Sequence, residues 1–444
     1  MRAIKRTFTI RKCGFCALLA LLLWGGEAGA QRALTLDECR ELALRGDLGL
    51  KSAQLEVEGA QEARKEAFTK YFPTVSATGM GFEANRGMAG VSILNGLFSA
   101  SFVKNGMMAG VTAVQPLFAG GQIVNGNRLA KVGVTVKQEQ LRQERDNLLL
   151  EVEQYFWQAR SLAEKLQTID AATRQLDTIC RDVSAAVEAG VAMRNDLLQA
   201  ELKRNSLASD RLKVENGLRV TKMLLGQRMD LAPDSFQIAN EPLDLARLPL
   251  PGSYRVDHRA ALSQTVAYRL LEQNVRASEL RKRMEIGKYL PTVGVGVGYL
   301  YYGIPNHQAI DIVDNHRSFG VVFASVAIPL SGWWGGAHAI RQRAAQVRIA
   351  EYSRERDGDL LVIQMEQLWN ELDEAYRQAA IAGESVEKAE ENLRLSRDAY
   401  EAGTATMSDL LDAQTLLRQS RDQYVDDMAA YLQKRTKYLQ ATGR

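Results

Sequence analysis

Residues 148–187 have the sequence LLLEVEQYFWQARSLAEKLQTIDAATRQLDTICRDVSAAV, and residues 361–400 have the sequence LVIQMEQLWNELDEAYRQAAIAGESVEKAEENLRLSRDAY. Both stretches place apolar or small side chains at alternating steps of four and three residues. In the first stretch these are Leu148, Val152, Tyr155, Ala159, Leu162, Leu166, Ile169, Thr173, Leu176, Cys180, Val183 and Val187. In the second they are Leu361, Met365, Leu368, Leu372, Ala375, Ala379, Ala382, Val386, Ala389, Leu393, Ser396 and Tyr400. Such steps make a heptad seam, so each stretch is predicted to be a long helix that packs along one side.

The second seam repeats the first at a constant offset of 213 residues, and the offset extends beyond the seams. Residues 188–190 (EAG) match residues 401–403 (EAG), and residues 196–198 (DLL) match residues 409–411 (DLL). Because glycine adopts the left-handed conformation that ends many helices, each long helix is predicted to stop at its glycine and turn back as a second helix. The chain is therefore predicted to be one architecture made from two internal repeats.

Each repeat also carries a pair of predicted strands ahead of its long helix. Residues 71–75 (YFPTV) and 289–293 (YLPTV) end a helix at a proline, which cannot continue it. The residues that follow are small, aromatic or alternating, which is typical of strands. The predicted strands cover about 74–83 and 107–117 in the first repeat, and about 292–302 and 318–329 in the second. A polar, glycine-rich loop is predicted between the first two strands.

These patterns divide the chain into four parts. They are a signal peptide (1–30), a first repeat (31–230, with a helical hairpin over 122–226), a linker (231–256) and a second repeat (257–444, with a helical hairpin over 335–442). The linker holds four of the nine prolines, which is typical of a boundary. A helix over about 257–288 is expected to open the second repeat.

The first thirty residues have the pattern of a secretory signal peptide that is cleaved after Ala30. Five basic residues precede an apolar run over 15–24, and small residues follow at 28–30. An uncleaved anchor is the alternative, although the run is short for a bilayer. Cleavage would change the formal charge from +3 to about −1, so no basic surface for nucleic acid is expected.

Cys39 and Cys180 would remain in an oxidising compartment after cleavage. Since Cys180 lies on the seam, we expect it to be buried as an apolar side chain. A disulfide would require the two thiols to meet, and the predicted layout separates them.

No pattern in the chain indicates catalysis, a cofactor or a metal. Residues 294–298 (GVGVG) lack the spacing of a phosphate-binding loop and continue as a strand. The histidines show no metal-ligand spacing. One loop could hold a cation, because it groups His307, Asp311, Asp314 and His316.

No run of eighteen apolar residues follows residue 30, so any membrane crossing is expected to use strands. Four strands cannot close a useful barrel, and an open edge cannot face lipid. Three chains would supply twelve strands, within the range of outer-membrane barrels. The predicted fold is mainly α, with a trimeric twelve-stranded β-barrel and an α-helical coiled-coil barrel that projects into water.

The order and duplication of these features resemble the TolC family of outer-membrane efflux proteins. The features are the Tyr-x-Pro-Thr-Val stretch before each first strand, the Pro-Leu-x-x-Gly-Gly exit at 116–121, and the Ala-Gly turn with Asp-Leu-Leu six residues later. The resemblance implies a homotrimer in the outer membrane with a large periplasmic part. It also implies binding to a periplasmic adaptor and to an inner-membrane pump of the RND or ABC type, and passive export of drugs or other solutes.

The resemblance further implies that the two turns, Ala189-Gly190-Val191 and Ala402-Gly403-Thr404, are tips that meet the adaptor. Helix termination by glycine explains the two glycines equally well. Both interpretations are therefore kept.

Asp409 and Asp412 match the acidic entrance ring of the family, Tyr400 matches a tyrosine beside the gate, and Asp196 matches the acidic partner of that tyrosine. Ala405 stands where the family has a gate arginine, so the closed state is expected to be held differently. Acids in the first turn of a helix also act as caps and favour the helix dipole. The sequence leaves the choice between caps and an entrance ring open.

Two other classes of protein share part of the pattern. A periplasmic adaptor also has a signal peptide and a coiled-coil hairpin, but we expect one hairpin between small β-domains in that case. A structural coiled-coil protein of the envelope would not need the paired strands. The sequence favours the channel over both.

Overall fold

The computed structural model describes residues 32–85, 90–93, 98–101, 105–240, 243, 245–303 and 316–444. The signal peptide predicted for residues 1–30 lies outside these residues and stays a prediction. The same holds for most of the loop cation site, including His307, Asp311 and Asp314.

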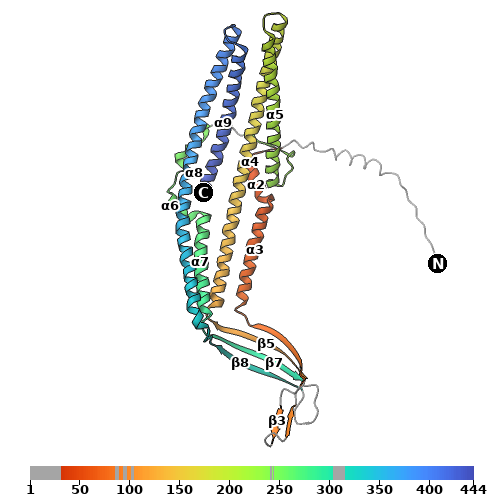
Figure 1. Ribbon diagram of the computed structural model, residues 1–444, viewed down its shortest axis with the longest axis vertical. Helices are drawn as coiled ribbons and strands as arrows, with labels where there is room; N and C mark the ends of the chain where they lie inside the picture. Colours follow the sequence, from red (N-terminus) through yellow and green to blue (C-terminus); the bar gives the residue numbers. More distant parts are fainter. Residues whose placement is uncertain are drawn as a thin grey trace, which may run out of the picture. The chain divides into compact units, whose positions relative to one another are not determined.

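The first repeat begins with a short strand and two helices (Figure 1). Its elements are β1 (Arg32–Leu34), α2 (Leu36–Gly46), α3 (Leu48–Thr69), β2 (Thr74–Glu83), β3 (Gly90–Ile93), β4 (Phe98–Ser101), β5 (Asn105–Ala119), α4 (Gln122–Glu188) and α5 (Arg194–Met229). The pair β3–β4 lies where the sequence predicted only a polar loop, so that prediction was wrong. Four-residue strands give too short an alternation to stand out in a sequence.

The linker and second repeat hold the remaining elements. They are β6 (Phe236–Ile238), the 3₁₀ turns η1 (Leu245–Arg247) and η2 (Pro251–Tyr254), α6 (His258–Ala261), η3 (Leu262–Gln264), α7 (Val266–Gly287), β7 (Thr292–Gly303), β8 (His316–Ala327), α8 (Gly332–Glu401) and α9 (Met407–Ala441). The single helix expected over 257–288 is broken, because Thr265 is extended and its hydroxyl accepts a hydrogen bond from Tyr268 N–H at 3.3 Å. Thr265 therefore begins α7 as an N-cap.

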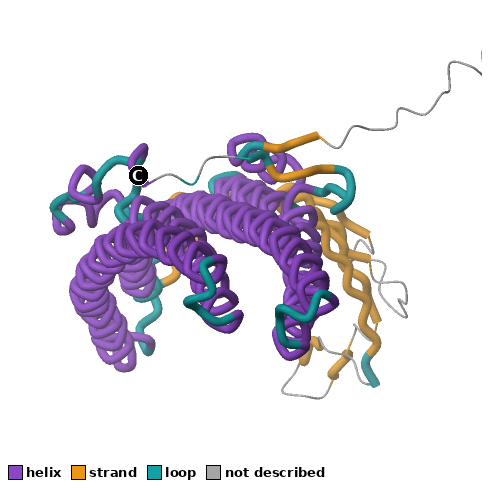
Figure 2. The backbone as a smooth tube through the Cα atoms, turned by 90° about the horizontal axis from the view of Figure 1, so that it is seen from above, coloured by secondary structure: helices purple, strands orange, loops and turns teal. Residues whose placement is uncertain are grey.

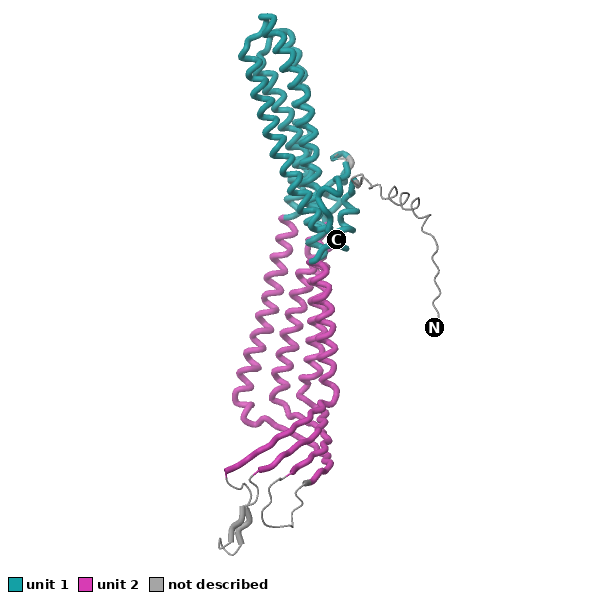
Figure 3. Tube along the Cα trace, turned by 90° about the vertical axis from the view of Figure 1, so that its right-hand side faces the viewer, with its two compact units in different colours: residues 1–48, 145–255, 368–440 teal, residues 49–144, 256–367, 441–444 magenta. Residues whose placement is uncertain are grey.

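The chain divides into two compact units that differ from the two sequence repeats (Figure 3). Unit 1 takes the chain up to Leu48, Arg145–Arg255 and Leu368–Gln440, and unit 2 takes Gly49–Glu144, Val256–Gln367 and Ala441–Arg444. Each unit therefore contains segments of both repeats. The two compact units reflect which segments pack together in space, whereas the two repeats are defined by similarity in sequence.

Unit 1 is built from the α4–α5 and α8–α9 hairpins, and both heptad seams are buried or half-buried along their whole length. The predicted seams are thus confirmed. The linker contributes to this unit, since β6 pairs with β1 in parallel and Phe236 is fully buried. The sequence indicated no strand in the linker, because three-residue strands carry no periodicity.

Unit 2 contains an antiparallel sheet in the order β2-β5-β7-β8. Within the described residues, no further strand pairs with the outer side of β2 or β8. The glycines of β7 have a packing reason, because a Cβ on Gly296 would collide with the ring of Phe323 on β8. The glycine leaves room for the aromatic ring on that face.

Cys39 and Cys180 are both free and buried, and Cys180 packs in an apolar cluster as expected. Among the helices that the structure describes, none has a stretch apolar and long enough to cross a membrane.

Candidate functional site

The two hairpins of unit 1 end in turns with the same backbone, seen as short loops between helices in Figure 2. Gly190 has a φ of +78° and Gly403 a φ of +74°. After Gly190, Val191 N–H donates to Ala186 C=O at 2.9 Å, and after Gly403, Thr404 N–H donates to Ala399 C=O at 2.9 Å. These bonds close a Schellman motif at each tip, which requires the left-handed glycine.

The helices that leave the two tips begin differently. In the second tip Thr406 and Asp409 form a capping box before α9. Thr406 N–H donates to the Asp409 carboxylate at 2.8 Å, and Asp409 N–H donates to the Thr406 hydroxyl at 3.3 Å. In the first tip the equivalent of Thr406 is Met193, and no side chain caps α5. The sequence analysis did not consider Thr406, although Thr-x-x-Asp is close to the capping-box pattern.

The carboxylates predicted for the entrance have different environments. Hydrogen bonds from the Thr406 hydroxyl and N–H hold the pKa of Asp409 below its ordinary value, so Asp409 is ionised at neutral pH. Its role as a cap is therefore shown by geometry. Asp412 is also exposed, but it makes no hydrogen bond or ion pair with any residue that the structure describes.

Tyr400 and Asp196 come from different hairpins, and the structure brings them near each other. Tyr400 is half-buried, and its pKa is raised by burial and, less strongly, by the negative charge of Asp196. The tyrosine also packs against Leu410 and other apolar side chains. The two hairpins are thus connected close to both tips.

Apolar side chains that the sequence analysis did not single out join the hairpins here. Met407 and Leu411, at the start of α9, pack against Leu176, Cys180 and Val183 of α4. Met407 is 2% exposed and Leu411 7% exposed. This apolar contact joins the start of α9 to α4 close to the tips.

A cavity of about 550 Å³ lies beside these contacts, between α4 and the end of α8. Asp182 of α4 and Arg397 and Glu401 of α8 contribute charged groups to its lining, and Tyr400 contributes its ring. No group of His, Cys, Asp or Glu able to hold a metal occurs among the described residues.

The sheet of unit 2 exposes a row of valines on one of its faces. Cross-strand register places Val75, Ala113, Val297 and Val322 in one row across all four strands. Of these, Val322 is 81% exposed, Val75 66% and Val297 53%. The opposite face is mixed: the Ser76 and Thr112 hydroxyls are hydrogen-bonded there at 3.0 Å, and Met80 and Phe319 are exposed on it. A row of exposed apolar side chains across all four strands is the pattern expected on the lipid-facing side of membrane strands.

Residues 40–219 and 261–444 match the family described as outer membrane efflux protein. The chain belongs to this family. The matched ranges cover most of both repeats, so the family assignment rests on the whole duplicated unit. The resemblance to the TolC family that the sequence indicated is confirmed. The function is that of an outer membrane efflux channel. The family is one of channels and not of enzymes.

Solved structures with the same fold include several outer-membrane channels. CusC has 15% sequence identity and a TM-score of 0.77, over 92% of each chain. VceC from Vibrio cholerae has 13% identity and a TM-score of 0.74, over 92% of this chain and 96% of VceC. The open-state channel MtrE of Neisseria gonorrhoeae has 14% identity and a TM-score of 0.73, over 92% of this chain and 88% of MtrE. No curated protein matches the chain.

Proposed function

We propose that three copies of this efflux channel form one pore in the outer membrane. The observation that carries the proposal is the sheet of unit 2, which exposes an apolar face and leaves the outer sides of β2 and β8 unpaired in the described chain. Free strand edges are not tolerated in lipid, because unpaired backbone groups cost several kcal/mol each. Pairing β8 of each protomer with β2 of the next would close a twelve-stranded barrel.

The long helices of this trimer would form the periplasmic part of the channel. Its partners are a periplasmic adaptor and an inner-membrane pump of the RND or ABC type, from which it receives solutes for passive export. The tips Ala189-Gly190-Val191 and Ala402-Gly403-Thr404 would meet the adaptor. Their support is exposure, since Val191 is 80% exposed and a Cβ on Gly190 or Gly403 would meet nothing within 4 Å.

Asp409 and Asp412 would line the periplasmic entrance, where three protomers supply six carboxylates. Such a ring concentrates cations through its negative potential. Asp409 serves in the proposal both as a helix cap and as a ring charge, whereas Asp412, without a partner in the described chain, contributes charge alone. Tyr400 and Asp196 would hold the gate together with the apolar side chains Met407 and Leu411.

The trimer is tested by sedimentation equilibrium of the purified channel in mild detergent, together with membrane fractionation of the cells. We expect a trimer that stays with the outer membrane after carbonate extraction. A monomeric protein released by carbonate would contradict the proposal.

The entrance is tested in planar bilayers at low salt. We expect Asp412→Asn to lower cation selectivity and to weaken block by multivalent cations without changing the hairpin, because Asp412 has no capping role in the described structure. Asp409→Ala with Asp412→Ala should lower selectivity further. Unchanged reversal potentials in the double variant would show that both acids have structural roles only.

A further inference from the structure

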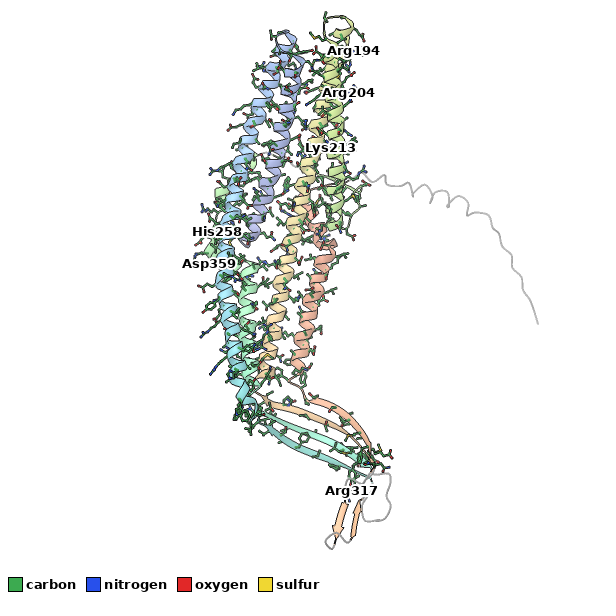
Figure 4. All side chains as sticks on the ribbon, in the orientation of Figure 1. Arg194, Arg204, Lys213, His258, Arg317 and Asp359 are labelled. Carbon is green, nitrogen blue, oxygen red and sulfur yellow. The ribbon has the colours of Figure 1, made fainter. Side chains whose placement is uncertain are left out.

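The four-stranded sheet of unit 2 carries Asp, Glu, Lys or Arg side chains only at the end away from its helices. β5 and β7 have none, Glu83 is the last residue of β2, and Arg317 is the second residue of β8. Figure 4 labels Arg317 at this end of the sheet. The ten residues of β8 that follow Arg317 span about 34 Å of strand, or about 24 Å across a bilayer at a tilt of about 45°. This matches the apolar band of an outer-membrane barrel, which is about 25 Å tall.

Exposed aromatic side chains gather at the other end of the sheet, where the strands meet the helices. We call them the aromatic belt: Phe68, Tyr71, Phe72, Phe118, Trp333 and Trp334. Trp334 is 85% exposed, and the ring of Phe68 lies 5.5 Å from that of Tyr71 and 5.6 Å from that of Phe72. Tryptophan and tyrosine favour the headgroup level of a membrane, because one part of each side chain is apolar and the other polar. The belt therefore marks a membrane surface on the helix side of the sheet.

The helix ends beside the belt are strongly basic. Residues 122–134, 276–288 and 332–344, at the sheet ends of α4, α7 and α8, contain nine Lys or Arg residues and two Asp or Glu residues. The whole chain has 56 and 53 of these, so its composition does not explain the excess. Residues 58–70, at the end of α3, hold three of each sign. The basic excess thus belongs to three of the four helix ends.

Most of these cations have no partner in the described chain. Glu285 accepts a hydrogen bond from Lys288 at 3.0 Å and lies 3.5 Å from the Arg343 guanidinium. Six other cations within nine residues of a helix end make no ion pair with any residue that the structure describes. We call these six the basic collar: Arg128, Lys131, Arg281, Lys282, Arg283 and Arg341. Lys282 is half-buried and the other five are exposed, so the collar can bind an anion outside the chain.

The backbone adds to the positive potential of the collar. α4 and α8 both begin at the belt, and neither has an acidic residue in its first turn. The partial positive charge at the start of each helix is therefore not compensated by its own side chains. An anion at the level of the belt is attracted by the cations and by both helix starts.

The collar lies close enough to the belt to reach lipid headgroups. Arg341 follows Trp334 by seven residues, so both lie on one face of α8, about 10 Å apart along the helix. The headgroup layer is about 5–8 Å thick on each side of the bilayer core, and a long arginine side chain can extend toward it while its charge stays hydrated. Screening at physiological salt acts over about 8 Å, so the attraction persists at this distance.

From the uncharged strands, the aromatic belt and the unpaired cations, we propose that the basic collar binds anionic phospholipid headgroups in the leaflet on the helix side. The inference rests on the outer-membrane channel proposed above and adds a lipid preference to it. Each Lys or Arg near a membrane surface favours an anionic lipid by about fivefold. A zwitterionic headgroup has no net charge and gains much less.

A collar that faced the pore would attract anionic solutes instead of lipid. The shared face of Trp334 and Arg341 favours lipid, because a tryptophan that is 85% exposed at the belt places the arginine on the same outer side. The pore-facing arrangement is one outcome of the test.

The test measures tryptophan fluorescence of the full-length channel in vesicles of equal parts phosphatidylglycerol and phosphatidylcholine. One of the two lipids is brominated in each sample, because bromine quenches tryptophans that it contacts. Trp333 and Trp334 report on the belt, whereas Trp157 and Trp369 are 5% and 7% exposed and lie in unit 1. Trp334→Phe should therefore remove most of the quenching.

Brominated phosphatidylglycerol should quench at least three times as strongly as brominated phosphatidylcholine at about 0.15 M salt. The difference should disappear at about 1 M salt, where charges are screened within about 3 Å. Equal quenching by the two lipids at the lower salt concentration would overturn the inference. Absence of quenching by either lipid would instead refute the membrane channel on which it rests.

A triple variant with one substitution in each helix tests the collar itself. Arg128→Gln with Arg283→Gln and Arg341→Gln should bring the ratio of quenching close to one, and folding should not change because all three side chains are exposed. The matched control is Arg194→Gln with Arg219→Gln and Arg397→Gln, three exposed and unpaired arginines of unit 1. The control has the same change of charge and should keep the lipid preference.

Two results of the triple variant would overturn the inference. An unchanged preference for phosphatidylglycerol would show that other cations attract the lipid. An unchanged preference together with a shifted reversal potential in phosphatidylcholine bilayers would show that the collar faces the pore and acts on solutes.

Discussion

The return helices α5 and α9 are copies in sequence, yet the same repeat position has opposite environments in them. Leu411 of α9 is 7% exposed and packs on α4, whereas its equivalent Leu198 of α5 is 47% exposed. Met407 is buried, whereas its equivalent Arg194 is exposed. Duplication reproduces the helix and its apolar pattern. The neighbouring helices of α5 and α9 differ, and these neighbours decide which side chains find a partner within the chain.

The largest difference is expected between alanine substitutions of Leu411 and of its equivalent Leu198. Leu411→Ala should lower the free energy of unfolding by about 2–5 kcal/mol, because it leaves a cavity between the hairpins. Leu198→Ala should change the stability of the protomer by no more than about 0.5 kcal/mol. Hydrogen exchange of residues 176–183 measures the loss. Equal effects of the two substitutions would contradict the comparison.

The two tips should respond equally to substitution of their glycines, because the backbone conformation is the same in both. Gly190→Val and Gly403→Val should each destabilise the turn by about 1–2 kcal/mol, because both glycines are left-handed and no neighbouring atom interferes. Circular dichroism melting of the two variants checks the effect. A clear difference between them would show that the turns are not equivalent.

The proposed adaptor contact predicts a further effect at the same glycines. Gly190→Asp or Gly403→Asp should abolish export and leave the trimer in the membrane. Gly→Asn at the same positions is the matched control, since asparagine has a similar shape and tolerates the left-handed conformation. Normal export in both aspartate variants would refute the contact.

The helix starts should respond unequally. Thr406→Ala should cost about 1 kcal/mol, because α9 loses its capping box, whereas Met193→Ala should be close to neutral. Conversely, Met193→Thr should stabilise α5 by forming a capping box with Asp196. Hydrogen exchange of the first turn of each helix measures all three. A stabilising effect of Thr406→Ala would be inconsistent with the observed bonds.

The smallest effect concerns pH. The folded state lowers the pKa of Asp409, so its contribution to stability is present above the ordinary pKa of an aspartate and is lost as the pH falls through the lowered value. Amide exchange of residues 407–411, corrected for its intrinsic pH dependence, should therefore speed up below about pH 4. Asp409→Asn should remove this pH dependence. Its persistence in that variant would assign the effect to another group.

Much of the fold could be predicted from local pattern. The long helices and the tip glycines follow from heptad steps and from the preference of glycine for positive φ, and the observed β7 spans Thr292–Gly303 against a predicted 292–302. The breaks at Thr265 and the β1–β6 pair were missed, because a three-residue strand or a single extended residue leaves no period to detect. The cap formed by Thr406 was detectable, since its partner lies only three residues away.

The sequence by itself determined the helices and the turns, which depend on residues near each other in the chain. It also determined the repeated unit and the family, which follow from recurring sequence patterns. Only the tertiary structure decided which heptad positions are used. The pattern of apolar side chains is nearly the same at Leu198 and Leu411, but burial depends on which helix lies alongside, and residues more than 200 positions apart determine that. The same reason explains why Asp196 approaches Tyr400, while Asp412 has no partner among the described residues. Periodicity specifies a face, and the arrangement of helices specifies what the face meets.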